Sequence, residues 1–479
     1  MTDRSPAKCA LCVDLDGTLC RTDTLWELAA QAFRRDPRAV LRAGICLARH
    51  RRPELFKADL ADIVDFDARG LPWCREVLAE IHKARLEGRK VVLATASAAR
   101  VAGAVAREIA LFDEVFSSTR ETNLKGHAKA KVLEQHFATF EYIGDSPADL
   151  PAWEAAGRAV CVVRKGRPLP SAAAGIQGMR ALPVESPAGS GAWRLLRPHQ
   201  WVKNLLVFVP VLTSHRWSQP QDVAAASAAF VSLSLAASAV YCINDILDAP
   251  EDRHHPEKRH RPVASGVMPI PGAIAIAAAL AGLAFAPAFY LPPAFSLALG
   301  AYFAFAAAYV VFLKRLENWD YSTLGVLYML RVIAGGAATG IGCSLWLLGF
   351  ACVFFANLAI LKRYSEILVW RREGIESMPG RAYLSRHARP LHRLGRVLSL
   401  ASGLLVAVYA FSSQAGSLYS SPLWLLGSAA ALLVWERKMW FRAARGRILG
   451  DPVLYAAKWP FSFLCAGVAA LCIVFAMVL

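Results

Sequence analysis

The sequence predicts two folds in one chain: an α/β Rossmann-like domain with a small helical cap, then an all-α polytopic membrane domain of nine transmembrane helices. Its 479 residues exceed the length of most single domains. Only 19% of the residues are charged and 56% are hydrophobic, whereas soluble domains carry about 25% charged residues. The long apolar runs gather in residues 191–479, which hold 26 Lys and Arg and 13 Asp and Glu, against 28 and 24 in residues 1–190. This excludes a disordered chain, a fibrous repeat and a single soluble enzyme.

Three apolar segments of the first half predict strands of a parallel sheet. They end in Asp14 and Asp16, in Thr95, and in Asp145. The carboxyl ends of parallel strands meet at one edge of a sheet. We therefore expect these polar side chains to meet a ligand at that edge.

The residues between the first and second strands predict a helical cap over about 20–88. Helical periodicity covers 25–33, 40–47 and 77–81. The cap is basic, which predicts either contact with anionic lipid headgroups or an ordinary solvated helix face. A Pro-, Gly- and Ser-rich linker follows at 186–193. We therefore expect domains at 1–185 and 194–479.

The eleven cysteines follow no disulfide framework. Cys9 and Cys12 have CxxC spacing, but neither a second CxxC nor a His pair accompanies them, which argues against a zinc site. The N-terminus has no apolar segment typical of a secretory signal. We expect the first domain to be cytoplasmic and its thiols to be reduced.

In chain order, the Asp14-Leu-Asp16-Gly-Thr run, Thr95, a lysine and the Gly-Asp145-Ser-Pro-Ala-Asp149 run resemble the haloacid dehalogenase (HAD) superfamily of phosphatases, over roughly residues 8–180. The resemblance implies that Asp14 is the nucleophile and Asp16 the general acid and base.

The same resemblance implies phosphoryl contacts from Thr95, with Ser97 as the alternative, and from Lys129, with Lys125 as the alternative. It also implies an Mg²⁺ site, with Asp14, Asp16 and Asp145 as the expected ligands. Asp149 is either part of this site or an orienting or capping residue. A retained fold without catalysis is the alternative for the whole domain.

Uncharged stretches of the second half predict the membrane spans, because about 20 apolar residues cross a bilayer. They lie at 223–244, 262–313 (broken by two prolines), 332–361, 397–435 (two spans) and 459–479. A short span at about 202–217 and one that opens near Tyr321 bring the count to nine.

Loop charges predict the orientation of these spans. The even-numbered loops hold 21 Lys and Arg, and the odd-numbered loops hold only Arg216. By the positive-inside rule, the first domain faces the cytoplasm of the inner membrane and the C-terminus lies outside. The basic charge follows the membrane ends, which favours anionic lipid or a phosphorylated substrate over nucleic acid. Whether the protein forms a homo-oligomer stays open.

Three acids at the end of the second span predict a second Mg²⁺ site. Asp245, Asp248 and Asp252 are spaced so that all three share one helix face. Mg²⁺ binds one or two carboxylates together with phosphate oxygens of a substrate. The neighbouring cations suit phosphate, and they are Arg253, Lys258 and Arg261. A solvated acidic helix cap is the alternative.

The Asn244-Asp245-x-x-Asp248-x-x-x-Asp252 motif resembles the first motif of the UbiA superfamily of intramembrane prenyltransferases, and the resemblance covers about 194–479. Four segments look like the branch that transfers phosphoribose from phosphoribosyl diphosphate (PRPP) to a polyprenyl phosphate. They contain Lys203 and Asn204, the basic run through Arg261, Tyr328 and Arg331, and Lys362, Arg363 and Glu366. The resemblance implies that these residues bind substrate and that Asp245, Asp248 and Asp252 are catalytic metal ligands.

One departure from the superfamily separates the alternatives. Its second aspartate motif, DxxxD, is replaced by Lys362-Arg363-Tyr364-Ser365-Glu366. Two cations in place of a metal cluster favour a site for anionic lipid phosphate beside a sugar diphosphate. Arg331 lies inside a span, where a lone charge needs a ligand or an ion pair with another span.

The sequence therefore predicts a bifunctional enzyme that makes polyprenyl-phosphoribose 5-phosphate and then removes the 5-phosphate. Two alternatives stay open: a prenyltransferase with an HAD domain of separate role, and a transporter that uses Arg331 and the aspartates as a substrate path.

Overall fold

The computed structural model describes residues 9–185, 191–255, 257–372, 374, 383–448 and 450–479. Most of the expected linker, 186–190, lies outside the described residues. The chain forms two compact units, Met1–Leu195 with Cys242–Ile276, and Leu196–Tyr241 with Ala277–Leu479. Cys242–Ile276, at and after the end of the second predicted span, thus groups with the N-terminal unit. The expected boundary at 186–193 assigned these residues to the membrane domain.

The N-terminal unit is built on a six-stranded parallel sheet with the strand order β3-β2-β1-β4-β5-β6. The strands are β1 (Ala10–Val13), β2 (Val91–Ala98), β3 (Glu114–Ser118), β4 (Phe140–Gly144), β5 (Arg158–Arg164) and β6 (Arg180–Val184). The strand order reverses at β1 and β4, and ligands bind at such a point in open parallel sheets. The predicted Rossmann-like fold is confirmed.

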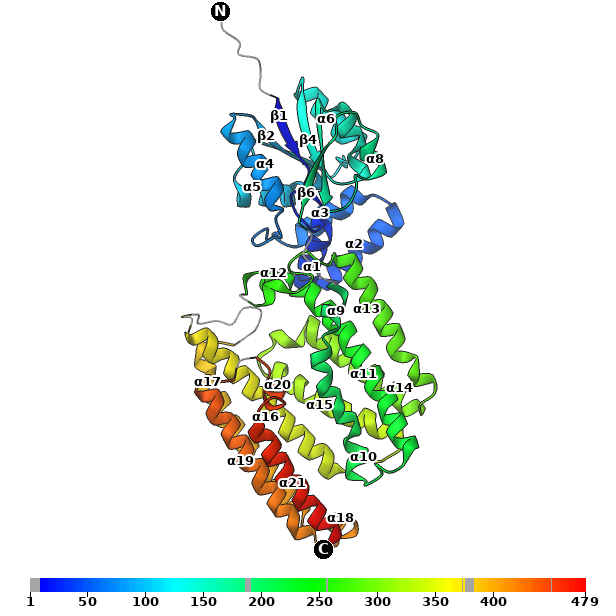
Figure 1. Cartoon of the computed structure of the whole chain (residues 1–479), viewed down its shortest axis with the longest axis vertical. Helices are drawn as coiled ribbons and strands as arrows, with labels where there is room; N and C mark the ends of the chain where they lie inside the picture. The colour runs from blue at the N-terminus through cyan, green and yellow to red at the C-terminus, as the bar shows by residue number, and fades with distance from the viewer. Residues whose placement is uncertain (1–8, 186–190, 256, 373, 375–382, 449) are drawn as a thin grey trace, which may run out of the picture. The chain divides into compact units, whose positions relative to one another are not determined.

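Helices cover both faces of this sheet, so its strands consist of nearly continuous apolar residues. α4 (Arg75–Leu86) and α5 (Ala99–Ile109) pack on one face. α6 (His127–His136), α7 (Leu150–Ala155) and α8 (Ser171–Ala174) pack on the other (Figure 1). Side chains alternate between the faces: Leu11 and Val13 enter the first core, and Ala10 and Cys12 enter the second.

The cap consists of three helices, α1 (Thr24–Arg35), α2 (Pro37–His50) and α3 (Pro53–Ile63), which contact one another. Asp36 ends α1 and caps α2, because its carboxylate accepts from two N–H groups of the first turn. The expected cap extended to about residue 88, but α4 packs on β2 and β6 and so belongs to the sheet layer. Periodicity alone did not separate α1 from α4, since both helices bury one face.

The second unit is helical. Its long helices are α11 (Pro220–Leu247), α13 (Ile270–Phe285), α14 (Pro293–Val311), α15 (Glu317–Thr339), α16 (Leu345–Arg372), α17 (Ala388–Tyr409), α19 (Leu425–Ala444) and α21 (Pro460–Val478); α11 and α13 extend into the first unit. α17, α19 and α21 lie side by side (Figure 1). The two prolines break the uncharged 262–313 stretch as expected, because α14 begins at Pro293.

Short elements connect these helices. The α-helices are α9 (Gly191–Leu196), α10 (Val209–Thr213), α12 (Ala249–His254), α18 (Ser413–Leu418) and α20 (Pro452–Ala456). The 3₁₀ helices are η1 (Pro147–Asp149), η2 (Pro198–Phe208), η3 (Lys258–His260), η4 (Pro287–Phe289), η5 (Leu313–Arg315), η6 (Ser385–His387) and η7 (Pro422–Trp424).

Seven helices in the described part of the chain are long and apolar enough to cross a membrane, so the count of nine is not confirmed. They are Pro220–Leu247, Ile270–Phe289, Pro293–Val311, Trp319–Thr339, Leu345–Arg372, Ser385–Tyr409 and Pro460–Val478. The expected first span is instead the irregular η2 followed by the short α10. α19, the other difference, carries four charged side chains in its second half. The apolar helices and the family membership established below make this an integral membrane protein.

Candidate functional sites

The first candidate site lies at the carboxyl ends of β1 and β4. Asp14 follows β1, and Asp145 follows β4, which pairs with β1. Gly17, three residues after Asp14, has φ +78° and packs against Asp145. A Cβ at Gly17 would lie 2.2 Å from Asp145 Oδ2. Thr18 donates a hydrogen bond to Asp145 Oδ1 (3.2 Å). The turn therefore requires glycine and places the two carboxylates together.

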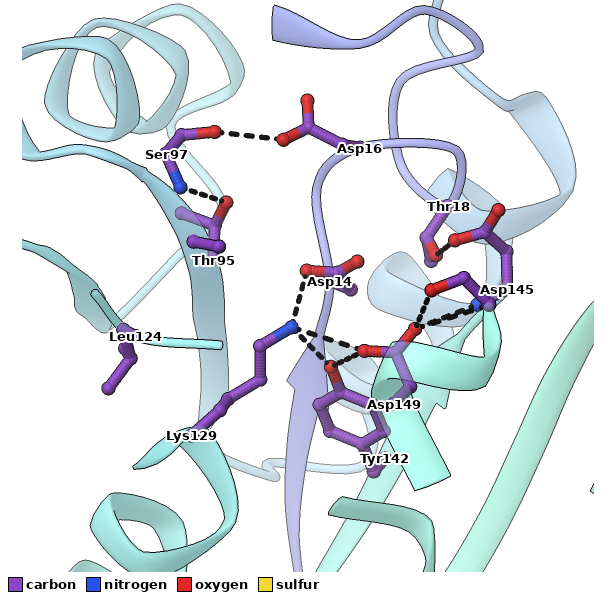
Figure 2. A network of polar contacts seen from close by, with 12 residues as sticks. Asp14, Asp16, Thr18, Thr95, Ser97, Leu124, Lys129, Tyr142, Asp145 and Asp149 are labelled. Carbon is purple, nitrogen blue, oxygen red and sulfur yellow. Dashed lines mark hydrogen bonds and ion pairs between the residues drawn. The ribbon is translucent and has the colours of Figure 1, made fainter. Parts of the chain in front are cut away.

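Lys129 lies at the centre of this site (Figure 2). Its Nζ donates to Asp14 Oδ1 (2.8 Å), the Tyr142 hydroxyl oxygen (2.8 Å) and Asp149 Oδ1 (3.2 Å). The side chain is only 4% exposed. Lys125 lies on the exposed loop before α6 and lines the cavity. The structure thus places Lys129, the preferred of the two lysines, against the expected nucleophile.

Asp16 points away from Asp14 and toward β2 (Figure 2). Its carboxylate accepts from Ser97 Oγ (2.9 Å) and from the backbone N–H of Thr24 (2.6 Å). Burial raises the pKa of Asp16, which favours the proton that a general acid needs. Thr95 is fully buried and its Oγ1 accepts from the Ser97 N–H (3.0 Å), whereas Ser97 lines the cavity. The geometry favours Ser97, the alternative, as the phosphoryl contact.

The carboxylates of this site fit a divalent cation. Asp14, Asp145 and Asp149 each offer one oxygen within 4.8 Å of the others. Burial raises the pKa of Asp14 and of Asp145 to about 7, and a bound cation would relieve this cost. Asp149 also accepts from Lys129, Tyr142 and Ser146, which supports an orienting role. The carboxylate of Asp16, an expected ligand, lies outside this group.

A cavity of about 920 Å³ opens over these residues. Its wall includes the acids and Ser97, and its cationic side chains include Arg21, Lys57 and Lys125. Lys57 belongs to cap helix α3 and donates to the Ala96 carbonyl oxygen (2.7 Å). The cavity therefore offers both a metal-binding floor and cations for a phosphorylated substrate.

The second candidate site begins at the end of α11. Asn244 and Asp245 lie in its last turn, Asp248 precedes α12, and Asp252 lies within α12. Asp245 and Asp252 are buried, at 1% and 4% exposure. Arg261 forms a salt bridge with each, 3.4 Å from Asp245 Oδ1. Arg261 thus lies among the acids. The expectation that all three acids share one helix face is corrected, because α11 ends at Leu247 and α12 begins at Ala249, so Asp245 and Asp252 lie on different helices. Carboxylates remain a type of donor that suits Mg²⁺.

Arg253 differs from its expected role in phosphate binding. Its guanidinium donates to both carboxylate oxygens of Glu27 in α1 and to the carbonyl oxygen of Ala264 (3.0 Å). Both side chains are buried, at 3% and 1% exposure. The donors of Arg253 are therefore used within the N-terminal unit. Lys258 lies exposed in η3, where phosphate could reach it.

A cationic pair lies in the second unit. The ammonium groups of Lys203 in η2 and Lys362 in α16 both contact Oδ2 of Asp451, the latter at 3.4 Å. Lys203 and Asp451 are 10% and 9% exposed. Although burial acts in the opposite direction, Lys362 and Lys203 hold the pKa of Asp451 well below its usual range. The structure brings together two predicted phosphate ligands and an acid that was not predicted.

Arg331 is held by neutral groups. Its guanidinium donates to Asn204 Oδ1 (2.8 Å), the Leu327 carbonyl oxygen (2.6 Å) and the Tyr302 hydroxyl (2.9 Å). It also lies over the rings of Tyr302 and Tyr328, 4.8 and 5.3 Å from their centres. Among the residues that the structure describes, no carboxylate forms a salt bridge with it. The ion-pair alternative is thus not supported, and the charge is available for an anion.

Arg363 does not join the cationic pair. Its guanidinium is fully buried and contacts both oxygens of Asp320, the hydroxyl of Tyr309 (2.9 Å) and the carboxylate of Glu366. Arg363 and Glu366, which were expected to bind substrate, thus take part in an ion-pair network between helices. Of the two cations of this motif, only Lys362 belongs to the cationic pair.

This network predicts that Arg363→Ala destabilises the fold. The change leaves the buried Asp320 carboxylate without its bidentate partner, a loss that costs about 3–5 kcal/mol in buried ion pairs. Thermal unfolding in detergent should show a large decrease in the unfolding temperature. Arg371→Ala, on an exposed position of the same helix, is the control. Equal unfolding temperatures of the two variants would contradict the assignment.

Several residues of these networks were not predicted, among them Tyr142, Tyr302, Asp320 and Asp451. Asp451 precedes a proline, which is a signal for a helix N-cap and not for binding. Tyr142 and Tyr302 lie in apolar segments, where a tyrosine usually serves as core. Their partners lie on other elements, so periodicity gives no sign of them.

Comparisons with known proteins agree with both motifs. The model of the UbiA prenyltransferase family matches residues 206–450, and the model of haloacid dehalogenase-like hydrolases matches residues 11–154. An uncharacterized protein y4nM of Sinorhizobium fredii is 32% identical over 98% of this chain and 91% of its own length. Both domains therefore recur together in a relative.

Two further relatives match part of this chain. Nodulation protein NoeC of Azorhizobium caulinodans is 31% identical over 59% of this chain and 91% of its own length. Decaprenyl-phosphate phosphoribosyltransferase of Mycobacterium tuberculosis is 38% identical over 39% of this chain, and the match spans 63% of that relative. Among solved structures, a UbiA homolog from Archaeoglobus fulgidus bound to DMAPP and Mg²⁺ covers 60% of this chain and 100% of its own, with a TM-score of 0.46 and 18% identity.

Proposed function

Because this chain belongs to the UbiA prenyltransferase family and carries a haloacid dehalogenase-like hydrolase domain at its N-terminus, we propose that it is a bifunctional membrane enzyme. Its UbiA domain transfers 5-phosphoribose from PRPP to a polyprenyl phosphate. Its hydrolase domain then removes the 5-phosphate and leaves polyprenyl-phosphoryl-ribose. Holding both sites in one chain raises the effective concentration of the intermediate for the second site.

The observation that carries the transferase proposal is the excess of cations over acids in the second unit. Lys203, Lys362 and Arg331 accompany one carboxylate, Asp451, in the contacts of the described residues. Such a set suits phosphate oxygens. The name of the mycobacterial relative, decaprenyl-phosphate phosphoribosyltransferase, supports PRPP as the donor.

In the proposed transfer, an oxygen of the lipid phosphate forms a bond to C1 of ribose while the bond from C1 to the diphosphate breaks. The cations hold phosphate oxygens of the two substrates. Asp245, Asp248 and Asp252 would hold Mg²⁺ in this domain, and Asp14 and Asp145 would hold it in the hydrolase domain. When bound, Mg²⁺ neutralises phosphate charge at either site.

In the proposed hydrolysis, Asp14 attacks the 5-phosphorus and the bond to the ribose O5 breaks. Asp16 protonates O5 and then takes a proton from the water that releases inorganic phosphate from Asp14. Lys129 and Ser97 bind the phosphoryl oxygens. The hydrogen bonds of Asp16 to Ser97 and Thr24 hold it apart from Asp14, which supports separate roles for the two acids.

The location follows from the charge of the loops. We propose that the protein lies in the inner membrane with its hydrolase domain in the cytoplasm and its C-terminus outside, because the basic loops share one side. Cytoplasmic PRPP would then be accessible to the transferase site.

The direct test supplies the purified protein with PRPP and polyprenyl phosphate and follows the lipid by mass spectrometry. We expect polyprenyl-phosphoryl-ribose together with one diphosphate and one inorganic phosphate per turnover. Replacing PRPP by a prenyl diphosphate, with an aromatic acceptor, tests the prenyltransferase that the family name suggests. Product from the prenyl diphosphate and aromatic acceptor, with none from PRPP and polyprenyl phosphate, would overturn the proposal. Uptake of a substrate into proteoliposomes without any product would indicate a transporter.

A further inference from the structure

Asp451 lies where three parts of the second unit meet. Lys203 comes from η2, Lys362 comes from α16, and Asp451 precedes α20. The two ammonium groups approach the same oxygen, Oδ2, and so lie side by side. Two ammonium groups held this close repel each other strongly at a partly buried position unless an acid lies between them.

The other oxygen of Asp451 has a separate task. Oδ1 accepts from the N–H of Val453 (3.0 Å) and caps α20. The carboxylate is therefore oriented by the backbone and does not depend on the lysines for its position. This geometry allows Asp451 to place the lysines, and not the reverse.

The surroundings contain more positive than negative charge. Lys203 precedes Asn204, which accepts from Arg331, and the ring of Tyr328 lies beneath Arg331. Lys203, Lys362 and Arg331 are thus linked to one acid through Asp451 and through Asn204, the residue after Lys203. The excess of positive charge matches the oxygens of a phosphate or diphosphate.

We propose that Asp451 is a positioning residue that holds Lys203 and Lys362 as a paired clamp for phosphate oxygens of a substrate. The proposal rests on the proposed function in that this site takes a phosphorylated substrate. Either the sugar diphosphate or the lipid phosphate supplies these oxygens, and the kinetic arms below distinguish them.

The first test uses Asp451→Asn, because asparagine keeps the helix cap and loses the charge. Steady-state titrations vary PRPP and polyprenyl phosphate separately. We expect KM to rise about tenfold or more for the substrate whose phosphate the clamp holds, with kcat and the other KM changed less. Asp451→Ser, which also keeps a capping oxygen, should behave alike. Asp222→Asn is the matched control. It removes a buried acid of the first turn of α11 that forms a salt bridge with Arg216.

A double-mutant comparison separates positioning from general damage. If Asp451 acts through the lysines, Asp451→Asn has little further effect in a Lys203→Met, Lys362→Met background. Equal KM increases with and without the lysines would overturn the proposal. So would equal effects of Asp451→Asn and Asp222→Asn.

A labelling experiment needs no turnover. An amine-reactive reagent is applied to the full chain, with and without inorganic diphosphate or inorganic phosphate, and labels on Lys203 and Lys362 are quantified by mass spectrometry. We expect diphosphate to protect both lysines in the parent protein and to protect them at least tenfold less effectively in Asp451→Asn. Protection without any PRPP turnover would reject the proposed donor and keep the clamp. Absence of protection by inorganic diphosphate and by inorganic phosphate alike, or equal protection in both proteins, would reject the clamp.

Discussion

Asp14→Asn is expected to stop phosphate release by the hydrolase domain while transfer by the UbiA domain continues. The amide cannot form the phosphoryl bond that the carboxylate forms, and it is a poorer ligand for Mg²⁺. Removal of a catalytic nucleophile lowers turnover by about 10⁴-fold or more. The lipid product should therefore accumulate with its 5-phosphate, which mass spectrometry detects directly.

The fold should survive this change. Lys129 keeps its hydrogen bonds to Tyr142 and Asp149, and the new side chain has the same size. Asp113→Asn is the control, since Asp113 pairs with Arg85 away from the cavity. Normal release of inorganic phosphate by Asp14→Asn would show that the N-terminal domain is not the proposed phosphatase. A loss of transfer as well would show that the two reactions are not separable.

Asp245→Asn is expected to abolish transfer, a loss of at least about 100-fold. Asp245 is the most buried of the three acids in its motif and lies beside Arg261. Replacing it removes one expected metal ligand and half of the charge that Arg261 faces. Arg261 keeps its salt bridge with Asp252, so the local structure should hold.

The control for this prediction lies on the same helix. Asp222→Asn changes a buried acid in the first turn of α11 without touching the motif. Product formation from PRPP, binding of Mg²⁺ and the unfolding temperature are compared between the two variants. Near-normal turnover of Asp245→Asn, or normal Mg²⁺ binding, would overturn the assignment of the metal site.

Much of the fold was predictable because the pattern of apolar residues is local. The apolar strands that end in Asp14, Thr95 and Asp145 lie in one parallel sheet, as expected. The proline break before α14 and most membrane helices also follow from runs of side chains adjacent in the sequence. The expected count of nine included a first span at about 202–217. This segment forms the 3₁₀ helix Pro198–Phe208 and the short helix Val209–Thr213 instead of one long helix.

The order of residues along the chain establishes which chemical groups are present and where strands and spans begin. The partners of those groups depend on folding in three dimensions. Lys129 rather than Lys125 contacts Asp14, Arg363 is used by Asp320, and Asp451 joins two lysines. The physical reason is that an ion pair depends on distance in space, and these partners are separated by 43 to 248 residues along the chain. Periodicity reports which face of an element is buried, but not which charge from another element will meet it there.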